Sequence, residues 1–294
     1  MPGSRDSLTE EQNKKALVVC GPTASGKSEV SDTLAEALTR EHGAFVPTLV
    51  VDSMQVYREI PTITNQARRR PAELLGIVSV TEEWTVARHT TRAEKIISRT
   101  EPPFVLDAGT GMYLNAILLD IPLAPKVEAN TRRTAQRQTA GAPNPRRAAR
   151  ARELELAGAA SRQSIWDGEP RFDTAIIYLR PVRETLDAAI SRRSEEILRG
   201  GLEEAAKLVE MQRAGATINA SVADSIGVRE LTEHISGKIT AEDAKSLINT
   251  RTRQLARRQI RWFDKLVRTF EGRMPITVLP NPNQLNTMHG RIWA

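Results

Sequence analysis

The sequence predicts an α/β fold: a parallel β-sheet flanked by helices, with a small inserted helical segment. Short apolar runs alternate with longer stretches of helical periodicity, an order typical of strand–helix–strand units. The runs that we expect to form buried strands are residues 16–20, 48–51, 74–80, 104–106 and 174–179. A change of composition between residues 122 and 170, where arginines accumulate, indicates the inserted segment.

The first apolar run leads into a phosphate-binding motif. Residues 21–28 read Gly-Pro-Thr-Ala-Ser-Gly-Lys-Ser and fit the pattern G-x-x-x-x-G-K-[ST] at every fixed position. In such a loop, backbone N–H groups and the N-terminus of the next helix face the anion, the lysine reaches the terminal phosphate and the serine hydroxyl can hold Mg²⁺. We therefore predict a P-loop NTPase-like core with Ser28 as the metal ligand. The predicted diphosphate site consists of Gly21, Pro22, Thr23, Ala24, Ser25, Gly26, Lys27 and Ser28.

Two further strand ends deliver polar residues to the same edge of the predicted sheet. Asp52 follows the run 48–51, and Gly109-Thr110-Gly111 follows the run 104–106. Ligands bind at the carboxyl ends of the strands in open parallel sheets, so we expect these residues to lie beside the phosphate loop. Taken alone, Asp52 could equally be a helix cap, and a Gly-Thr-Gly turn is common where a strand meets a helix.

Capping and breaking residues set the expected helices. One helix should span residues 85–97. Pro181 suits the first turn of the helix after the last apolar run, and Gly200-Gly201 splits that helical region in two. Thr240 with Asp243 fits a capping pair at the start of a long last helix.

The last helix is amphipathic and rich in arginine. Apolar side chains recur at helical spacing over residues 244–266. An arginine stripe on nearly the opposite face consists of Arg253, Arg257 and Arg261. Arg251 and Arg258 lie close to the apolar edge, where an unpaired charge is costly. Their anionic partner could be a carboxylate of this chain or a substrate phosphate.

Composition restricts the class of protein. Lys and Arg number 42 against 36 Asp and Glu, which gives a net charge of +6. This excess favours a polyanionic partner, although a modest excess spread over the surface is also compatible with solubility alone. Cys20 is the only cysteine, so no intrachain disulfide can form. The N-terminus does not resemble a signal peptide and no apolar run reaches membrane length, so we expect a cytoplasmic protein.

The length of 294 residues favours one main body with a smaller satellite. We expect a catalytic core of residues 14–123 and 173–280, an insertion of residues 124–172, and loosely ordered tails of residues 1–13 and 281–294. Acidic residues are absent from positions 129–152, so the insertion should carry a basic face. The alternative interpretation of this segment is a solvated arginine-rich surface.

Several motifs follow the phosphate loop in order along nearly the whole chain. They are Asp52-Ser-Met-Gln-Val-Tyr-Arg58, Gly109-Thr-Gly-Met-Tyr-Leu114, Pro143-Asn144 with residues 146–153, Ile226-Gly-Val-Arg-Glu230 and Thr252-Arg-Gln-Leu-Ala-Arg-Arg-Gln-Ile-Arg-Trp-Phe263. Together they resemble the tRNA dimethylallyltransferase family, the isopentenyltransferases that prenylate adenosine beside the anticodon. The first and the last of these motifs distinguish that family from kinases and ATPases with a similar phosphate loop.

The resemblance implies transfer of a dimethylallyl group from dimethylallyl diphosphate to the exocyclic amine of adenine, with Mg²⁺ as cofactor. By analogy with the family, Asp52 accepts the proton or hydrogen bond of the amine, Thr110 contacts the acceptor nucleotide and Arg253 joins Lys27 in binding the diphosphate. The expected catalytic residues are thus Asp52, Thr110, Lys27 and Arg253. We expect a monomer that contacts the tRNA anticodon stem-loop through Asp52, Ser53, Met54, Gln55, Arg146, Arg147, Arg150, Arg229, Arg257, Arg258 and Arg261.

Departures from the family pattern leave the acceptor open. Gln66 stands at the usual lysine position, Ala108 replaces a usual glycine, and the insertion is short. Thr64-Asn65 is closer to related enzymes that prenylate free adenine nucleotides, so an adenylate dimethylallyltransferase acting on AMP, ADP or ATP is the alternative. The extended basic surface favours tRNA, because a small nucleotide does not require one. A P-loop kinase or ATPase and a non-catalytic RNA-binding protein are further alternatives.

Overall fold

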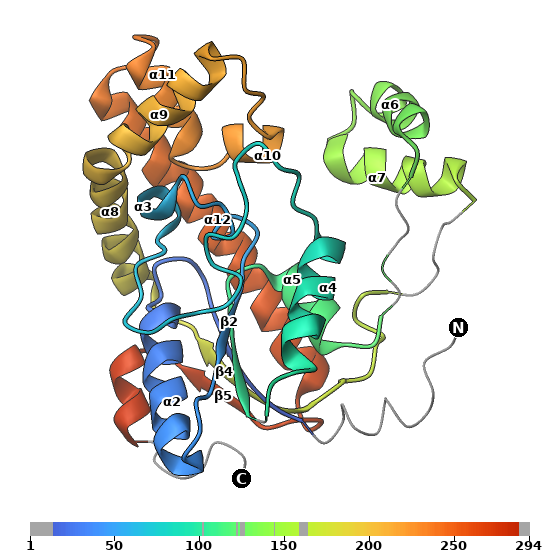
Figure 1. Cartoon of the computed structure of the whole chain (residues 1–294), viewed down its shortest axis with the longest axis vertical. Coiled ribbons are helices and arrows are strands. Elements are labelled where there is room, and N and C mark those ends of the chain that lie inside the picture. The colour runs from blue at the N-terminus through green and yellow to red at the C-terminus, as the bar shows by residue number, and fades with distance from the viewer. Residues whose placement is uncertain are drawn as a thin grey trace. The chain divides into compact units, whose positions relative to one another are not determined.

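The computed structural model describes residues 14–287 except 102, 122, 124–126, 144 and 159–163, and it describes only the backbone at 129, 145–147 and 286–287. Its five strands form one sheet in the order β2-β3-β1-β4-β5 (Figure 1). Every pair of neighbouring strands is parallel. The predicted parallel α/β fold is therefore confirmed.

Helices and strands alternate along much of the chain. In order they are β1 (Lys15–Cys20), α2 (Lys27–His42), β2 (Thr48–Val51), α3 (Pro61–Thr64), α4 (Val86–Ile97), β3 (Phe104–Ala108), α5 (Gly111–Leu118), α6 (Ala129–Gln138), α7 (Pro145–Leu156), β4 (Asp173–Leu179), α8 (Arg183–Gly200), α9 (Leu202–Arg213), α10 (Ala220–Ala223), α11 (Val228–Ile235), α12 (Ala241–Phe270), β5 (Ile276–Leu279) and the 3₁₀ helix η1 (Pro282–Thr287). The predicted helix over 85–97 corresponds to α4, which Thr85 caps, and Thr240 and Asp243 form the predicted capping box of α12.

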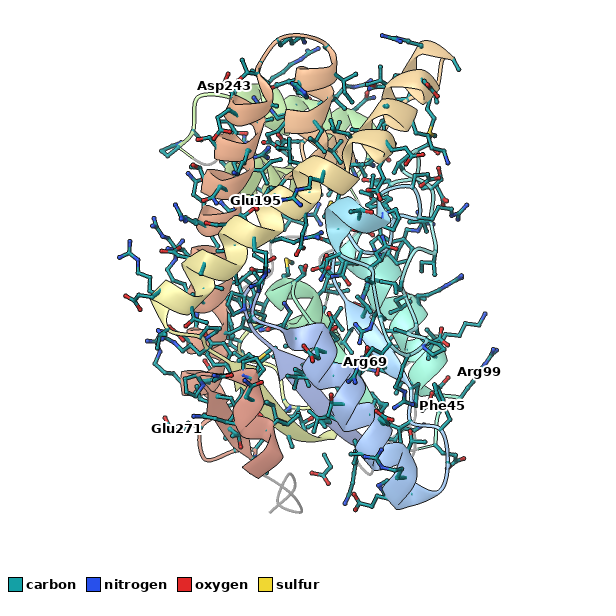
Figure 2. The ribbon with its side chains drawn as sticks, turned by 90° about the vertical axis from the view of Figure 1, so that its left-hand side faces the viewer. Phe45, Arg69, Arg99, Glu195, Asp243 and Glu271 are labelled. Atoms are coloured by element: carbon teal, nitrogen blue, oxygen red, sulfur yellow. The ribbon has the colours of Figure 1, made fainter. Side chains whose placement is uncertain are left out.

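The two faces of the sheet pack against different helices. Leu17 and Val19 pack with Val30 and Leu34 of α2 in one buried cluster. On β4, the Tyr178 hydroxyl donates to Asp264 of α12 over 2.9 Å. The sheet is thus covered by α2 on one face and by α12 on the other, and the side view in Figure 2 also shows α8 lying alongside α12.

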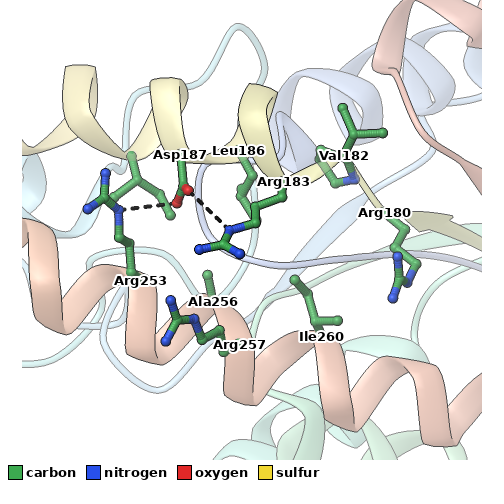
Figure 3. A pocket seen from close by; sticks show the side chains of 11 residues that line it. Arg180, Val182, Arg183, Leu186, Asp187, Arg253, Ala256, Arg257 and Ile260 are labelled. Carbon is green, nitrogen blue, oxygen red and sulfur yellow. Dashed lines mark ion pairs between the residues drawn. The ribbon is translucent and has the colours of Figure 1, made fainter.

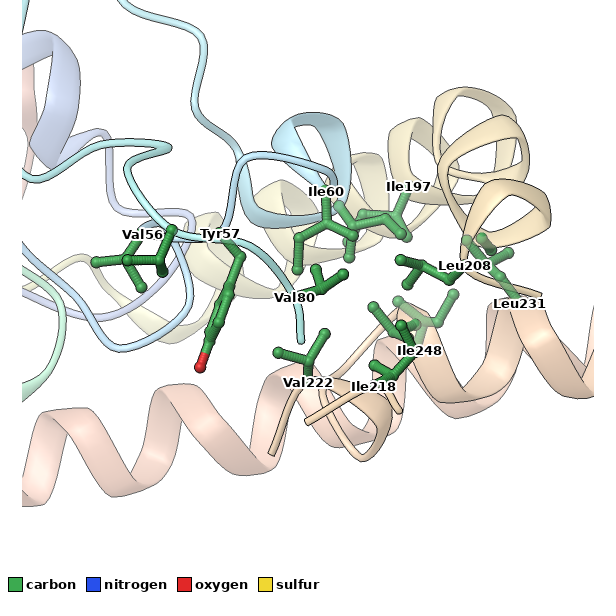
Figure 4. Packing of buried hydrophobic residues seen from close by; sticks show 14 residues of the cluster. Val56, Tyr57, Ile60, Val80, Ile197, Leu208, Ile218, Val222, Leu231 and Ile248 are labelled. Carbon is green, nitrogen blue, oxygen red and sulfur yellow. The ribbon is translucent and has the colours of Figure 1, made fainter. Parts of the chain in front are cut away.

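A second apolar core supports the segment that follows β2. Tyr57 and Ile60 of this segment are fully buried against Ile197 of α8, Leu208 of α9 and Ile248 of α12 (Figure 4). Burying a large apolar side chain contributes about 1.5–3 kcal/mol. These apolar contacts, which involve no strand of the sheet, therefore hold the segment that follows Asp52 in place.

Residues 119–169 form a compact unit of their own, separate from the unit made by the rest of the chain. Its two helices, α6 and α7, pack against each other and bury Ala135 and Ala149. Arg150 Nη1 pairs with Glu153 over 2.9 Å within α7. The predicted insertion, 124–172, overlaps this unit over residues 124–169.

Two local predictions differ from the structure. Residues 74–80 do not form the expected strand, because Leu74 and Gly76 have φ angles of +64° and +61° that interrupt an extended chain. In place of a strand ladder, isolated bridges form at Glu73 and Val78, and the Gly76 N–H donates to the Gln55 carbonyl over 2.9 Å. The edge strand β5 was not predicted. It is only four residues long and half-buried, so it lacks the pronounced apolar run of a central strand.

The ends of the chain are described in part. Residues 282–287, expected within a C-terminal tail, form η1, and Leu285 packs against the cluster of α2 and β1. The N-terminal tail 1–13 and residues 288–294 lie outside the described residues. Among the described helices, none has the length and apolar character needed to cross a membrane. Cys20 is a free, buried thiol at the end of β1.

Candidate active site

The phosphate-loop motif connects β1 to α2 at the carboxyl edge of the sheet. Gly26 adopts φ +86°, a conformation that favours glycine, and a β-carbon there would lie 3.2 Å from Pro282. Lys27 Nζ donates to the Pro22 carbonyl over 3.0 Å. The buried Ser25 hydroxyl has no hydrogen-bond partner among the described residues. The loop therefore presents a lysine, a helix N-terminus and an unsatisfied hydroxyl, groups that suit a phosphate.

Gly109, at the turn after β3, is where two predicted catalytic side chains meet. A β-carbon at this position would lie 2.6 Å from Asp52 Oδ2 and 3.7 Å from Lys27 Cε. Only a glycine allows the carboxylate and the lysine stem to approach the turn this closely. Thr110 Oγ1 donates to Asp52 Oδ2 over a long 3.5 Å and accepts from the Ser53 N–H over 3.2 Å. The structure thus brings together Lys27, Asp52 and Thr110.

Asp52 is held by its own turn. Its Oδ1 accepts from the Met54 N–H over 2.8 Å and from the Gln55 N–H over 3.3 Å. Burial raises the pKa of Asp52 above its ordinary value, and the Met54 N–H and the charge of Lys27 counteract this only in part. The side chain keeps some solvent access, because the residue is only half-buried. A carboxyl group with a raised pKa is a better proton acceptor at neutral pH than an ordinary aspartate.

The long helix α12 fastens the two turns to each other. Gln259 Oε1 accepts from the Thr23 N–H of the phosphate loop over 2.8 Å, and its Nε2 donates to the Gly109 carbonyl over 2.8 Å. Trp262 Nε1 donates to Asn115 Oδ1 over 3.2 Å, and its ring lies so close to Gly111 that a β-carbon there would clash at 2.2 Å. Gly109 therefore makes room for Asp52 and Lys27, whereas Gly111 makes room for the Trp262 ring.

A cavity of about 290 Å³ lies between α8 and α12 (Figure 3). Its apolar floor includes Leu186 and Ala256, which belong to a cluster with Ala24 of the phosphate loop. Four arginines line it: Arg180, Arg183, Arg253 and Arg257. Its one acidic residue, Asp187, lies 3.1 Å from Arg253 Nε without accepting a hydrogen bond from it, and 3.6 Å from Arg183. Arg253 therefore faces a basic cavity beside the phosphate loop.

A buried charged cluster below the loop was not predicted. Ser28 Oγ donates to Asp107 Oδ2 over 2.9 Å, and Arg68 Nη1 donates to the same oxygen over 2.5 Å. Arg68 also pairs with Asp32 of α2 over 2.7 Å, and all three charged side chains are at most 3% exposed. The only sequence signal was a charged residue inside an otherwise apolar strand, at Asp107.

The predicted tRNA-binding arginines fall into two groups. Arg257, Arg258 and Arg261 are exposed on α12, so Arg258 is not buried at the apolar edge and does not require an anionic partner from this chain. Arg251 does have such a partner, because it pairs with the buried Glu230. Arg229 pairs with Glu233 over 3.2 Å while remaining 54% exposed.

The other predicted tRNA contacts come from two short segments. Ser53, Met54 and Gln55 follow Asp52 and are half-buried, and Gln55 Oε1 has no hydrogen-bond partner among the described residues. Arg150 of α7 is half-buried and pairs with Glu153. Arg146 and Arg147 have backbone in α7, but their side chains lie outside the described residues.

The predicted magnesium ligand can be tested against this geometry. Because Ser28 donates its hydrogen to Asp107, its remaining lone pairs are available to a cation. Asp107 itself is occupied by Arg68, and no cluster of three or more potential acidic, His or Cys ligands exists among the described residues. Mg²⁺ commonly takes one or two protein ligands together with substrate phosphates and water. The site therefore fits an ion held jointly by Ser28 and a bound diphosphate, and does not fit a protein-only metal site.

The fold and the loop define a P-loop-like α/β protein with a carboxylate beside its phosphate-loop motif. The chain belongs to the IPP transferase family, whose model matches residues 55–144 and 133–266. The family consists of prenyltransferases, so the chain is an enzyme of that class.

Known proteins agree with this assignment. The tRNA dimethylallyltransferase of Rubrobacter xylanophilus is 58% identical over 96% of this chain and 100% of its own length. A eukaryotic dimethylallyltransferase acting on tRNA shares the fold, with a TM-score of 0.71 and 24% identity over 95% of this chain and 77% of that one. The tRNA isopentenylpyrophosphate transferase of Bacillus halodurans shares it with a TM-score of 0.67 and 22% identity over 96% of each chain.

Proposed function

We propose that this protein transfers a dimethylallyl group from dimethylallyl diphosphate to the exocyclic amine of the adenosine next to the anticodon of tRNA. One observation carries the proposal: the side chains of Asp52 and Lys27 both approach Gly109 where its β-carbon would stand. A group that serves the acceptor amine and a group that binds the donor diphosphate are thus neighbours. Transfer requires such proximity, because the reacting atoms must approach each other to about 3–3.5 Å.

The chemistry can be followed through these residues. The adenine amine nitrogen attacks the first carbon of the dimethylallyl group, and the carbon–oxygen bond to the diphosphate breaks with its electron pair leaving on the diphosphate. Asp52 accepts the proton that the amine nitrogen loses. Lys27, the backbone N–H groups of the loop and Arg253 stabilise the negative charge of the departing diphosphate. Thr110, which donates to Asp52, keeps the carboxylate turned toward the acceptor.

The acceptor in this proposal is tRNA rather than a free nucleotide. The 58% identical relative is named a tRNA dimethylallyltransferase, and the chain covers the whole of it. The exposed arginines Arg257, Arg258 and Arg261 on α12 offer positive charge to phosphates. Gln55, whose buried Oε1 has no partner among the described residues, is available to a base edge next to Asp52.

Further parts of the proposal concern the conditions of the reaction. Ser28 would hold Mg²⁺ together with the diphosphate, and the ion would supply positive charge that neutralises the developing phosphate charge. The enzyme acts as a monomer, since Lys27, Asp52, Thr110 and Arg253 all come from one chain, and this can be checked by sedimentation. It acts in the cytoplasm, where its tRNA substrate is found.

The experiment that tests the proposal offers one donor and several acceptors. The protein is incubated with radiolabelled dimethylallyl diphosphate, Mg²⁺ and either total tRNA or AMP, and the labelled product is separated by size. We expect label in tRNA and none in AMP. Label in AMP alone would establish the free-nucleotide alternative, and phosphate release from ATP without label in either acceptor would establish a P-loop ATPase.

A further inference from the structure

The cluster of Asp32, Arg68 and Asp107 is unusual because charged groups are rarely buried this completely. Their side chains are 2%, 3% and 3% exposed. Arg68 bridges the two carboxylates, and Asp32 also accepts from the Arg69 N–H over 3.0 Å. Replacing such buried charge clusters by apolar groups is often neutral or stabilising, so stability alone is a weak reason for one.

The cluster is connected to the phosphate loop at Ser28, closely through its hydroxyl and over a longer 3.5 Å through its carbonyl, which accepts from Arg68. Ser28 Oγ lies 2.9 Å from Asp107 Oδ2, the same oxygen that receives Arg68 Nη1. An ionised carboxylate accepts hydrogen bonds and cannot donate them, so the hydrogen of this contact belongs to Ser28. Arg68 pairs with this same carboxylate, so the buried Asp107 has a cationic partner within the cluster.

This direction of donation decides what Ser28 can bind. With its hydrogen turned down toward Asp107, the hydroxyl cannot donate to a phosphate oxygen above the loop. Its lone pairs are acceptors only, and acceptors attract a cation. A serine free to rotate would instead be able to donate to the phosphate and would lose its preference for a metal ion.

We infer that Asp107, held in place by Arg68 and Asp32, is a positioning residue that turns Ser28 into a ligand for the divalent cation accompanying the diphosphate. The inference rests on the proposed function, because the diphosphate donor belongs to that proposal. Asp107 acts only through Ser28 and touches neither the substrate nor the cation. The set of one arginine and two aspartates also keeps a net negative charge beneath the loop, which favours a cation above it.

The test measures binding rather than turnover. Inorganic pyrophosphate is titrated calorimetrically into the full chain at a series of Mg²⁺ concentrations, and the Mg²⁺ concentration for half-maximal binding is determined. Asp107→Val removes the acceptor and leaves Arg68 paired with Asp32. We expect this midpoint to rise about tenfold or more, the usual loss when a group that orients a metal ligand is removed. Asp107→Asn keeps an acceptor oxygen and should stay within about threefold of the parent.

A double-mutant cycle separates positioning from a structural role. If Asp107 acts through Ser28, Asp107→Val should add nothing in a Ser28→Ala background. Glu230→Gln is the matched control, since Glu230 is also a buried carboxylate paired with an arginine, in α11. It should lower the melting temperature and leave the Mg²⁺ midpoint unchanged.

Two results would overturn the inference. One is a folded Asp107→Val protein with the parental Mg²⁺ midpoint, and the other is a midpoint shift that multiplies with that of Ser28→Ala. Should Asp107→Val not fold, the variant Arg68→Met/Asp32→Asn/Asp107→Val removes the whole charged set and must show the same shift. If the parent binds no pyrophosphate at any Mg²⁺ concentration, the proposed function itself fails, which is a different outcome from an unaltered midpoint.

Discussion

Arginines are used in opposite ways below the phosphate loop and along α12. Arg68 is buried between two carboxylates, and its guanidinium makes four hydrogen bonds of 2.5–3.5 Å with Asp32, Asp107 and the Ser28 carbonyl. Arg257, Arg258 and Arg261 are exposed on one helix, and no ion pair is recorded for them within the described part of the chain. The first arrangement fixes groups within the protein, whereas the second leaves charge available to a large anion.

This difference separates the two substrates of the proposed reaction. In that proposal the donor binds at Lys27 and Ser28 of α2 and at Arg253 of α12, which lines the cavity. The tRNA meets side chains that can adjust to a backbone. Substitutions at the donor site should therefore change donor binding and the rate of transfer. Substitutions of the exposed arginines should change the salt dependence of tRNA binding.

The largest effect is expected for Lys27→Ala. This variant removes the charge beside Gly109 that the departing diphosphate requires, so single-turnover transfer should slow by about 10² or more and donor affinity should fall. Lys95→Ala, which removes an exposed lysine from the last turn of α4, is the control. If Lys27→Ala transferred at the parental rate, Lys27 of the phosphate loop would not act on the donor diphosphate.

Asp52→Asn should slow transfer by roughly 10² while leaving donor affinity nearly intact, because Asp52 serves the acceptor. In the parent, transfer should rise with pH through the raised pKa of Asp52, since only the ionised carboxylate accepts a proton. An aspartate whose folded pKa is raised lowers stability as pH rises toward that pKa. Asp52→Asn should therefore melt no lower than the parent at neutral pH. A loss confined to donor binding would instead identify Asp52 as a metal ligand.

A smaller effect is expected at Gln259, which links the donor and acceptor turns. Gln259→Leu leaves the Thr23 N–H and the Gly109 carbonyl without this partner, and it should reduce transfer about tenfold and stability by about 2 kcal/mol. Gln259→Glu keeps an acceptor for the Thr23 N–H, so its transfer rate and stability should lie between those of the parent and of Gln259→Leu. Gln254→Leu, at an exposed position of the same helix, controls for the added apolar side chain. Equal rates in all three variants would show that the link is dispensable.

The exposed arginines should affect tRNA binding alone. Replacing Arg257, Arg258 and Arg261 by alanine should flatten the slope of log affinity against log salt by roughly two to three units, with transfer at saturating tRNA unchanged. An unaltered slope would mean that this surface does not contact phosphates.

The smallest change is expected in the separate helical unit. The variant Arg146→Ala/Arg147→Ala/Arg150→Ala should flatten the salt slope by less than the α12 variant, by roughly one to two units, because Arg150 already pairs with Glu153. Filter binding of tRNA over a range of salt concentrations measures both triple variants. A larger change in the α7 variant would identify that unit as the main electrostatic contact.

The sequence predicted the position of the phosphate-loop motif beside Asp52 and Gly109 for a physical reason. A phosphate loop depends on local backbone conformation, so Gly21 to Ser28 can be recognised from spacing alone, and parallel strands bring Asp52 and Gly109 to the same edge. Arg68 could not be predicted in this way. Its partners are 36 and 39 residues away, and nothing in the intervening sequence marks the pairing.

Other failures also arose from contacts distant in sequence. The run 74–80 is apolar enough for a strand, but the positive φ angles of Leu74 and Gly76 turn it into an irregular segment whose Val78 is buried in the second core. Gln259 looked like one polar residue of a motif, and its role as a bridge depends on two turns that lie about 150 and 236 residues earlier in the chain.

The most direct test of the contrast between the two arginine arrangements measures both substrates on two variants. Affinities for dimethylallyl diphosphate with Mg²⁺ and for tRNA are determined separately for Lys27→Ala and for Arg257→Ala/Arg258→Ala/Arg261→Ala. We predict that Lys27→Ala weakens donor binding and leaves tRNA binding intact, while the triple variant does the reverse. Weakened donor binding in the triple variant, or weakened tRNA binding in Lys27→Ala, would contradict a site with separate donor and acceptor sides.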